Sequence, residues 1–169
     1  MNPNLLISYE PSKREKARQE VENIFKEIKE KHKIIDEKHK GVFKLRVKEP
    51  KSVVRRLNNK HSKKPQLFAA TFKYIPIDKW SKSTVIDMSK QMRSFDKKIA
   101  NRDSWKLDLK KRKHRSSSTS LILKLTDHIQ KPKVNLANPD KTVHVNIFGK
   151  KAALALLRKK EMLNTAKRK

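Results

Sequence analysis

The apolar residues of this chain fall at regular intervals, and those intervals constrain its fold more than any other feature. A disordered basic segment has no such period, so ordered elements are expected. In the first half, short apolar runs and alternating apolar residues predict strands near 5–9, 34–35, 43–47 and 68–74. Helical spacing predicts helices over 17–28 and 53–57. The order strand–helix–strand–strand–helix–strand is that of a ferredoxin-like unit, of the α/β (α+β) class.

Residues that start helices and turns agree with this order. Ser12 and Glu15 have the spacing of a capping box, and Pro50 suits the first turn of a helix. The chain has two glycines, Gly41 and Gly149, and each falls between two predicted strands. That placement predicts two hairpins.

The second half predicts a second, mixed sheet. Helical spacing indicates helices over 85–99 and 121–129, and strands are expected at 105–109, 134–136, 143–147 and 152–157. Asn138-Pro139-Asp140 has the composition of a turn between the second and third of these strands. Pro76 to Lys79 is a plausible joint. The expected organisation is a ferredoxin-like domain at 1–78, a second domain at 79–158 and a basic tail at 159–169.

The charge of the chain indicates its partner. There are 45 Lys and Arg against 17 Asp and Glu, a net charge of +28, which favours binding to nucleic acid. The absence of cysteine excludes disulfides, Cys-ligated zinc and a cysteine nucleophile. No apolar run reaches the length of a membrane span and the start lacks the form of a signal peptide, so we expect a cytoplasmic protein without a membrane partner.

One segment combines positive charge with a helix start. A basic run follows the strand at 105–109, and three serines then precede the helix at 121–129. Serines cap helix starts, where free amides and the helix dipole favour a phosphate group. The alternative is a solvated basic loop with an ordinary cap. We favour a phosphate site, and the candidate RNA-binding residues are Lys110, Lys111, Arg112, Lys113, His114, Arg115, Ser116, Ser117 and Ser118.

The stretch KLDLKKRKHRSSSTSLILKL, followed by KPKVNLANPDKTVHVNIFGKKAALALL, resembles the core of a THUMP domain, an RNA-binding module of tRNA-modifying systems. The family element V-[DN]-L-x-[NH]-P-[DE] is matched by Val134, Asn135, Leu136, Asn138, Pro139 and Asp140. The family usually has Asp at the second position, a departure that leaves the turn intact. THUMP domains typically follow a ferredoxin-like domain, so the resemblance covers about residues 4–158.

This resemblance implies a tRNA-binding protein that grips the acceptor stem and the 3′ end. The module fills the given chain, which resembles the stand-alone adaptor of the tRNA cytidine acetyltransferase. By that resemblance it would present tRNA to the enzyme that makes N4-acetylcytidine. The alternatives are a ribosome-associated or general RNA-binding protein, or the THUMP subunit of a methylating or thiolating enzyme.

An enzymatic role is disfavoured, and no cofactor is expected. Two isolated glycines cannot build a glycine-rich cofactor loop. His114 next to the three serines could suggest nucleophilic catalysis, but we interpret this proximity as chance. His32 and His39 are poor metal ligands because four lysines flank them, so no metal is expected. Trp80 and Trp105 are assigned to the core instead of to base stacking. DNA binding is disfavoured because no helix-turn-helix or basic zipper pattern is present.

Overall fold

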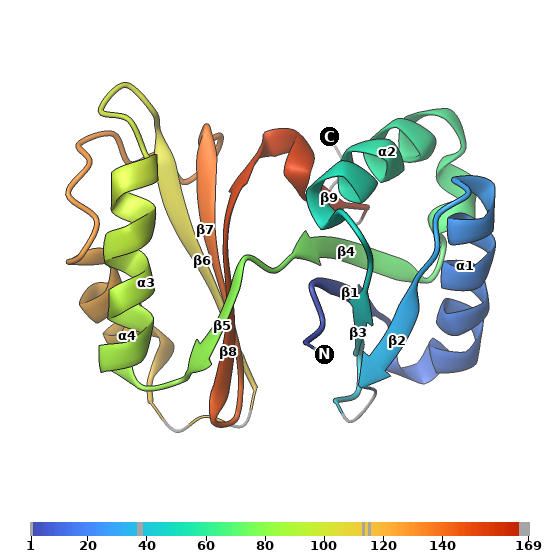
Figure 1. Cartoon of the computed structure of the whole chain (residues 1–169), viewed down its shortest axis with the longest axis horizontal. Coiled ribbons are helices and arrows are strands. Elements are labelled where there is room, and N and C mark those ends of the chain that lie inside the picture. Colours follow the sequence, from blue (N-terminus) through green and yellow to red (C-terminus); the bar gives the residue numbers. More distant parts are fainter. Residues whose placement is uncertain (1, 37–38, 113, 115, 166–169) are drawn as a thin grey trace. The chain divides into compact units, whose positions relative to one another are not determined.

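The computed structural model describes residues 2–36, 39–112, 114 and 116–165. The chain forms two compact units (Figure 1). The first unit runs up to Ile77 and resumes at Lys160, and the second unit comprises Asp78–Lys159. Each unit has its own sheet and its own apolar core.

The first unit has the predicted ferredoxin-like order. Its elements are β1 (Leu5–Tyr9), α1 (Arg14–Glu27), β2 (Lys33–Asp36), β3 (Val42–Arg46), α2 (Pro50–Lys63) and β4 (Thr71–Pro76). The strands lie in the order β2-β3-β1-β4, and every neighbouring pair is antiparallel. The apolar residues of α1 and α2 pack with those of the strands in one core. The fold-class prediction is therefore confirmed for this half of the chain.

The start of α1 differs from the predicted capping box. Pro11–Lys13 form a 3₁₀ turn, η1, and α1 begins only at Arg14. Glu10 caps this turn, since its carboxylate accepts hydrogen bonds from the amide and the hydroxyl of Ser12 at 3.5 and 3.3 Å. The Ser12 hydroxyl therefore donates to Glu10 and does not cap α1. A second 3₁₀ turn, η2 (Pro65–Phe68), leads into β4.

The chain segment after the second unit is not a simple tail. A 3₁₀ turn, η3 (Lys159–Glu161), leads into a short strand, β9 (Leu163–Asn164). β9 pairs antiparallel with β4, so it forms a fifth strand of the first sheet. Leu163 is buried in the first core, and the Thr165 amide donates to the Phe72 carbonyl at 2.7 Å. One apolar side chain and the open edge of β4 thus hold a segment whose composition is mostly basic.

The second unit is a mixed sheet covered on one face by two helices. Its elements are β5 (Lys79–Lys82), α3 (Val85–Lys98), β6 (Trp105–Arg112), α4 (Ser118–Thr126), β7 (Lys141–Phe148) and β8 (Lys151–Arg158). The strand order is β5-β8-β7-β6. β6 and β7 are parallel, and the other neighbours are antiparallel. α3 and α4 lie side by side against the sheet (Figure 1).

Both glycines are in hairpins, as predicted. Gly41 lies between β2 and β3 with φ +85°, and Gly149 joins β7 to β8 with φ +61°. This left-handed region of backbone space is unfavourable for residues with a Cβ atom. The two hairpins therefore depend on glycine at these positions.

Residues 134–136 do not form the predicted strand. Val134 makes a single parallel bridge to Trp105, and the chain then leaves the sheet. The reason is an Asx turn: Asn135 Oδ1 accepts hydrogen bonds from the amides of Ala137 and Asn138 at 3.1 and 3.0 Å. A side chain that satisfies these amides competes with strand pairing. Val134 and Leu136 are consequently 58% and 73% exposed.

Candidate nucleic-acid interface

The predicted phosphate site lies where β6 ends and α4 begins, wholly within the second unit. β6 extends to Arg112, so Lys110, Lys111 and Arg112 belong to the strand instead of following it. α4 begins at Ser118. The remaining two cations predicted for the site, Lys113 and Arg115, lie outside the described residues.

The start of α4 has the predicted serine cap. Ser117 is extended, with φ −69° and ψ 144°, and its Oγ accepts a hydrogen bond from the Ser120 amide at 3.0 Å. The Ser118 and Thr119 amides have no hydrogen-bond partner among the described residues. Ser116 and Ser117 are exposed, so this helix start is accessible to solvent. Two free amides at the positive end of a helix are suited to bind an anion.

Lys111 connects the strand to the loop that follows it. Its Nζ donates a hydrogen bond to the Ser116 carbonyl, which fixes the path of the backbone into α4. Lys111 therefore has a structural contact in addition to its charge. Lys110, one residue earlier, is exposed and has no carboxylate partner among the residues that the structure describes.

His114 holds the loop between β6 and α4 through both of its ring nitrogens. Its Nε2 lies 3.3 Å from the Ser83 carbonyl, and its Nδ1 accepts a hydrogen bond from the Ser116 amide at 3.3 Å. A carbonyl needs a donor and an amide needs an acceptor, so this pattern selects the neutral ring with hydrogen on Nε2. His114 is thus a positioning residue for the loop before α4.

Arg112 is held above an aromatic ring. Its guanidinium carbon lies 4.8 Å from the centroid of the Phe148 ring, in cation–π geometry. Nη1 is buried and has no hydrogen-bond partner among the described residues. Burial lowers the pKa of Arg112, but a guanidinium remains charged at neutral pH. A buried donor without an acceptor is costly, and the charge of the half-buried Arg112 favours an anion nearby.

The turn before β7 is a structural clasp. The Asp140 carboxylate accepts a hydrogen bond from the Ser104 amide at 2.9 Å, and the Asp140 amide donates to Ser104 Oγ at 2.8 Å. The bond from the Ser104 amide is the main reason why the pKa of Asp140 lies below its usual value. The predicted structural role is correct for Asp140. The side-chain acceptor of the turn, however, is Asn135 and not Asn138.

The histidines and tryptophans considered for other roles make the following contacts. His32 Nε2 lies 2.8 Å from Glu22 Oε1, and Lys44 Nζ lies 3.2 Å from His39 Nδ1. Among the residues described, no group of three or more His, Cys, Asp or Glu side chains is arranged to hold a metal ion. Trp105 is buried as predicted, and its indole donates to the Lys131 carbonyl at 3.0 Å. Trp80 is half-buried on β5, with its ring 6.1 Å from that of Phe148.

Two residues of this interface were missed in the sequence. Phe148 supports Arg112, and the carbonyl of Ser83 holds His114. Arg112 and Phe148 are partners in the parallel pairing of β6 with β7. No local pattern specifies the register of two parallel strands that are separated by a helix, so the sequence has no signal for this contact.

Residues 82–157 match the THUMP domain family. The chain contains a THUMP domain. The match spans almost all of the second unit and includes both the β6–α4 interface and the Asx turn. The resemblance predicted from the element at 134–140 is therefore confirmed for this half of the chain. A THUMP domain indicates RNA binding in tRNA modification.

Solved structures with a similar fold cover nearly the whole chain. PH1313 from Pyrococcus horikoshii Ot3 has a TM-score of 0.68 at 14% identity, over 97% of this chain and 55% of that one. TrmN from Thermus thermophilus has a TM-score of 0.56 at 13% identity, over 90% of this chain and 44% of that one. A predicted N6-adenine-specific DNA methylase from Listeria monocytogenes has a TM-score of 0.56 at 10% identity, over 92% of this chain and 40% of that one.

The chain spans about half the length of these proteins. At such low identity the likeness shows a shared fold only. No curated protein matches the sequence. In the part of the chain that the structure describes, no helix is both long and apolar enough to cross a membrane.

Proposed function

We propose that this protein is a non-catalytic tRNA-binding adaptor. It grips the acceptor stem and the 3′ end of tRNA and presents the tRNA to a separate enzyme, the cytidine acetyltransferase that makes N4-acetylcytidine. The observation that carries this proposal is the set of unpaired donors near the end of β6: the Ser118 and Thr119 amides at the start of α4 and, on the opposite face of the sheet, the Lys110 ammonium and the Arg112 guanidinium.

These groups share one chemical property, which is that they all donate hydrogen bonds. A phosphate group accepts several hydrogen bonds and carries the opposite charge. The 3′ end of tRNA is single-stranded, so its phosphates can approach the junction of β6 and α4 individually, whereas the acceptor duplex is bound by shape. The THUMP match over residues 82–157 supports RNA as the source of the phosphates.

The environment of His114 and the serines supports binding instead of nucleophilic catalysis. A serine nucleophile needs a nearby base with a free ring nitrogen. Both ring nitrogens of His114 face backbone groups, and Ser117 Oγ caps α4. These contacts stabilise the loop before α4 and leave the Ser118 and Thr119 amides to bind a ligand.

The first test compares intact tRNA with the same tRNA lacking its 3′ terminal nucleotides. The proposal predicts at least about tenfold weaker binding of the shortened tRNA, because several phosphate contacts are lost. Changing base pairs in the stem without changing its length should have little effect. Equal affinity for intact and shortened tRNA would contradict recognition of the 3′ end.

The second test addresses the adaptor role. The purified protein with tRNA and acetyl-CoA should make no acetylcytidine, and adding the separate acetyltransferase should give modification faster than the enzyme alone. Mass spectrometry of all modified tRNA nucleosides after gene deletion identifies the reaction that depends on the protein. Loss of a methylated or thiolated nucleoside with normal acetylcytidine would assign it to another tRNA-modifying enzyme. Recovery with ribosomal subunits at high salt would assign it to the ribosome.

A further inference from the structure

The outer edge of β6 is partly used by the chain itself. β6 is the last strand of its sheet, with β7 on its inner side. At its start, the Trp105 amide donates to the Lys133 carbonyl at 2.9 Å, and the Asn135 amide donates to the Trp105 carbonyl at 3.0 Å. The Asx turn of Asn135 then takes the chain away from this edge. The pairing therefore stops after one residue of β6.

The rest of this edge remains open. In a strand, the amides and carbonyls of successive residues point to opposite edges. The backbone groups of Trp105, Leu107 and Leu109 therefore point to the outer edge, because those of the residues between them point toward β7. The Gly149 amide donates to the Arg112 carbonyl at 2.8 Å, which agrees with this alternation. Among the described residues, the amides and carbonyls of Leu107 and Leu109 have no partner on the outer side.

The side chains beside the edge differ between the two faces of the sheet. Leu107 and Leu109 pack against the apolar core under α3 and α4 and are only partly buried. Lys106 and Lys110 point to the opposite face, where Lys106 Nζ lies 3.6 Å from Asp108 Oδ2. Leu136, 73% exposed, lies next to this strand, since Lys106 Nζ contacts its carbonyl at 3.5 Å.

We propose that this edge binds an extended segment of a partner protein in which apolar and acidic residues alternate. The segment adds a strand to β6, with its apolar side chains beside Leu107 and Leu109 and its carboxylates beside Lys106 and Lys110. A peptide backbone supplies both the acceptors and the donors that the open amides and carbonyls need. An RNA phosphate supplies acceptors only. A second copy of this chain would bring like charges together.

This inference extends the proposed function, because an adaptor needs a protein partner as well as tRNA. The probe is a capped eight-residue peptide that alternates valine and glutamate. On binding, the Leu107 and Leu109 amides should exchange with solvent at least about tenfold more slowly. The matched control peptide has the same composition with four valines followed by four glutamates, and it should give no such protection.

Two further peptides test the backbone hydrogen bonds without altering the protein. One is N-methylated at the valines and the other at the glutamates, so one of them loses the amides that face β6. That peptide should bind at least about tenfold more weakly, since two or more hydrogen bonds are lost. If both methylated peptides bind like the parent, or if the block peptide binds equally well, the attraction is only electrostatic and the proposal is wrong.

A protein variant separates this proposal from RNA binding. Leu109→Pro removes one outward amide at a position where an edge strand tolerates proline. It should weaken binding of the alternating peptide at least about fivefold and leave tRNA affinity unchanged. If the variant does not fold, the methylated peptides provide the test.

If tRNA, and not the peptide, protects the Leu107 and Leu109 amides from exchange, the edge is an RNA contact. If neither protects them, the lysines serve only to prevent edge-to-edge aggregation. Either result overturns the inference.

Discussion

In the first unit, acidic side chains of α1 and of the segment after it reach cations of α2 and of its C-cap residue, Lys64. In the second unit, the cations at the end of β6 have no carboxylate partner among the described residues. Glu27 Oε1 lies 3.3 Å from Lys64 Nζ, and Glu30 Oε1 lies 2.6 Å from Arg56 Nη1. The hydrogen bond from Lys64 is the main reason why the pKa of Glu27 is lowered. A cation that is paired within the fold is less available to a phosphate.

Two carboxylates of the second unit, those of Asp103 and Asp140, lie at the opposite end of β6. Asp103 Oδ2 is 2.9 Å from Lys141 Nζ, and Asp140 accepts from the Ser104 amide at 2.9 Å. One end of this strand is thus held by acidic side chains, and the other end presents unpaired donors. Under the proposed function, the position of the carboxylates, more than the number of lysines, distinguishes a structural region from the region that would bind RNA.

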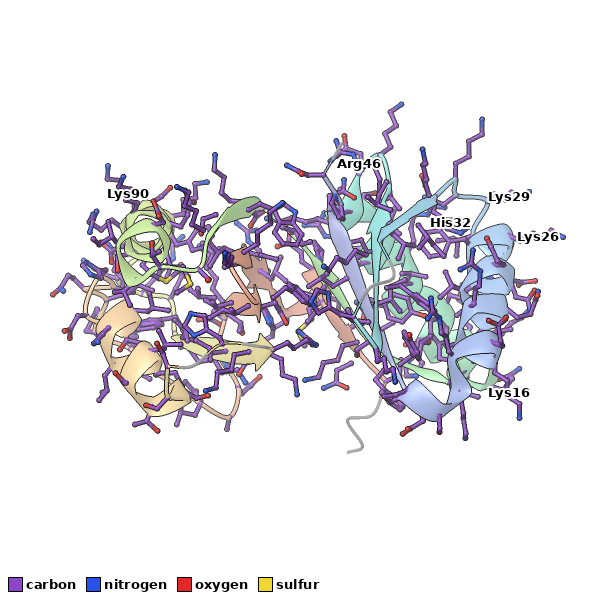
Figure 2. The ribbon with its side chains drawn as sticks, turned by 90° about the horizontal axis from the view of Figure 1, so that it is seen from below. Lys16, Lys26, Lys29, His32, Arg46 and Lys90 are labelled. Carbon is purple, nitrogen blue, oxygen red and sulfur yellow. The ribbon has the colours of Figure 1, made fainter. Side chains whose placement is uncertain are left out.

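Exposed lysines alone do not define the interface. Lys16, Lys26 and Lys29 project from the first unit around α1, and Lys90 projects from α3 in the second (Figure 2). Such charges attract RNA at long range, and salt screens this attraction. They lack the free amides found at the start of α4 and the guanidinium stacked on Phe148. The following predictions test this distinction, from the largest expected effect to the smallest.

The largest expected effect is structural and lies in the first unit. The Glu20 carboxylate accepts hydrogen bonds from the amides of Ala69, Ala70 and Thr71 at 2.8, 2.9 and 2.8 Å. Glu20→Ala leaves these amides without acceptors and should lower the free energy of unfolding by about 2–3 kcal/mol. Urea unfolding measures this loss. Glu15→Ala, an exposed change in the same helix, is the control and should have a much smaller effect. Weaker tRNA binding by folded Glu20→Ala would contradict a purely structural role.

The next effect concerns RNA affinity and the second unit. Arg112→Ala removes the guanidinium stacked on Phe148 and should weaken tRNA binding by about tenfold, or about 1.4 kcal/mol. Lys64→Ala removes a cation that is paired with Glu27 and is the matched control. Fluorescence anisotropy at one salt concentration measures the tRNA affinity of both variants. Equal losses for the two variants would show that RNA senses total charge and not this site.

A smaller effect is expected at the turn before β7. Pro139 is buried, and its ring restricts the unfolded chain. Pro139→Gly should lower the free energy of unfolding by about 1 kcal/mol through greater freedom of the unfolded state. The tRNA affinity of the folded variant should be unchanged. If affinity falls while stability is retained, the turn itself contacts RNA.

The smallest effect is a change in the pH dependence of stability. Because the folded-state pKa of Asp140 is lowered, its carboxylate stabilises the fold at pH values above its unfolded pKa of about 3.9. This contribution is lost as the pH falls through the lowered pKa. Asp140→Asn should therefore flatten the decline in thermal stability below about pH 4. An unchanged acid profile would contradict the clasp between Asp140 and Ser104.

Much of the fold is predictable from residue periodicity. The alternation of Val143, Val145 and Ile147 and the following Gly149 specify the β7–β8 hairpin, and Ser117 specifies the start of α4. β5 was not predicted because Lys79–Lys82 has one apolar residue, Trp80, and no alternation. Its strand conformation depends on antiparallel pairing with β8.

The candidate site could be predicted only in part. The basic run and the serine cap are local features, so the sequence identifies them. The contact of Arg112 with Phe148 depends on the register of β6 against β7, and the open amides of Leu107 and Leu109 depend on which strand is outermost. Both are consequences of the assembled sheet. β9 also depends on the assembled sheet, because its two residues form a strand only by pairing with β4.

The most direct test of the central claim is the salt dependence of tRNA binding. The logarithm of the affinity is measured against the logarithm of the salt concentration for the unmodified protein and two double variants. Lys110→Ala with Arg112→Ala should reduce the magnitude of the slope by roughly 1.4–1.8, since each lost phosphate contact contributes about 0.7–0.9. Lys60→Ala with Lys64→Ala removes the same charge from the cations that Glu27 pairs at the end of α2, and should reduce the slope by less than half as much. Equal reductions by the two double variants would contradict the claim that the unpaired donors of β6 and α4 form the RNA-binding site.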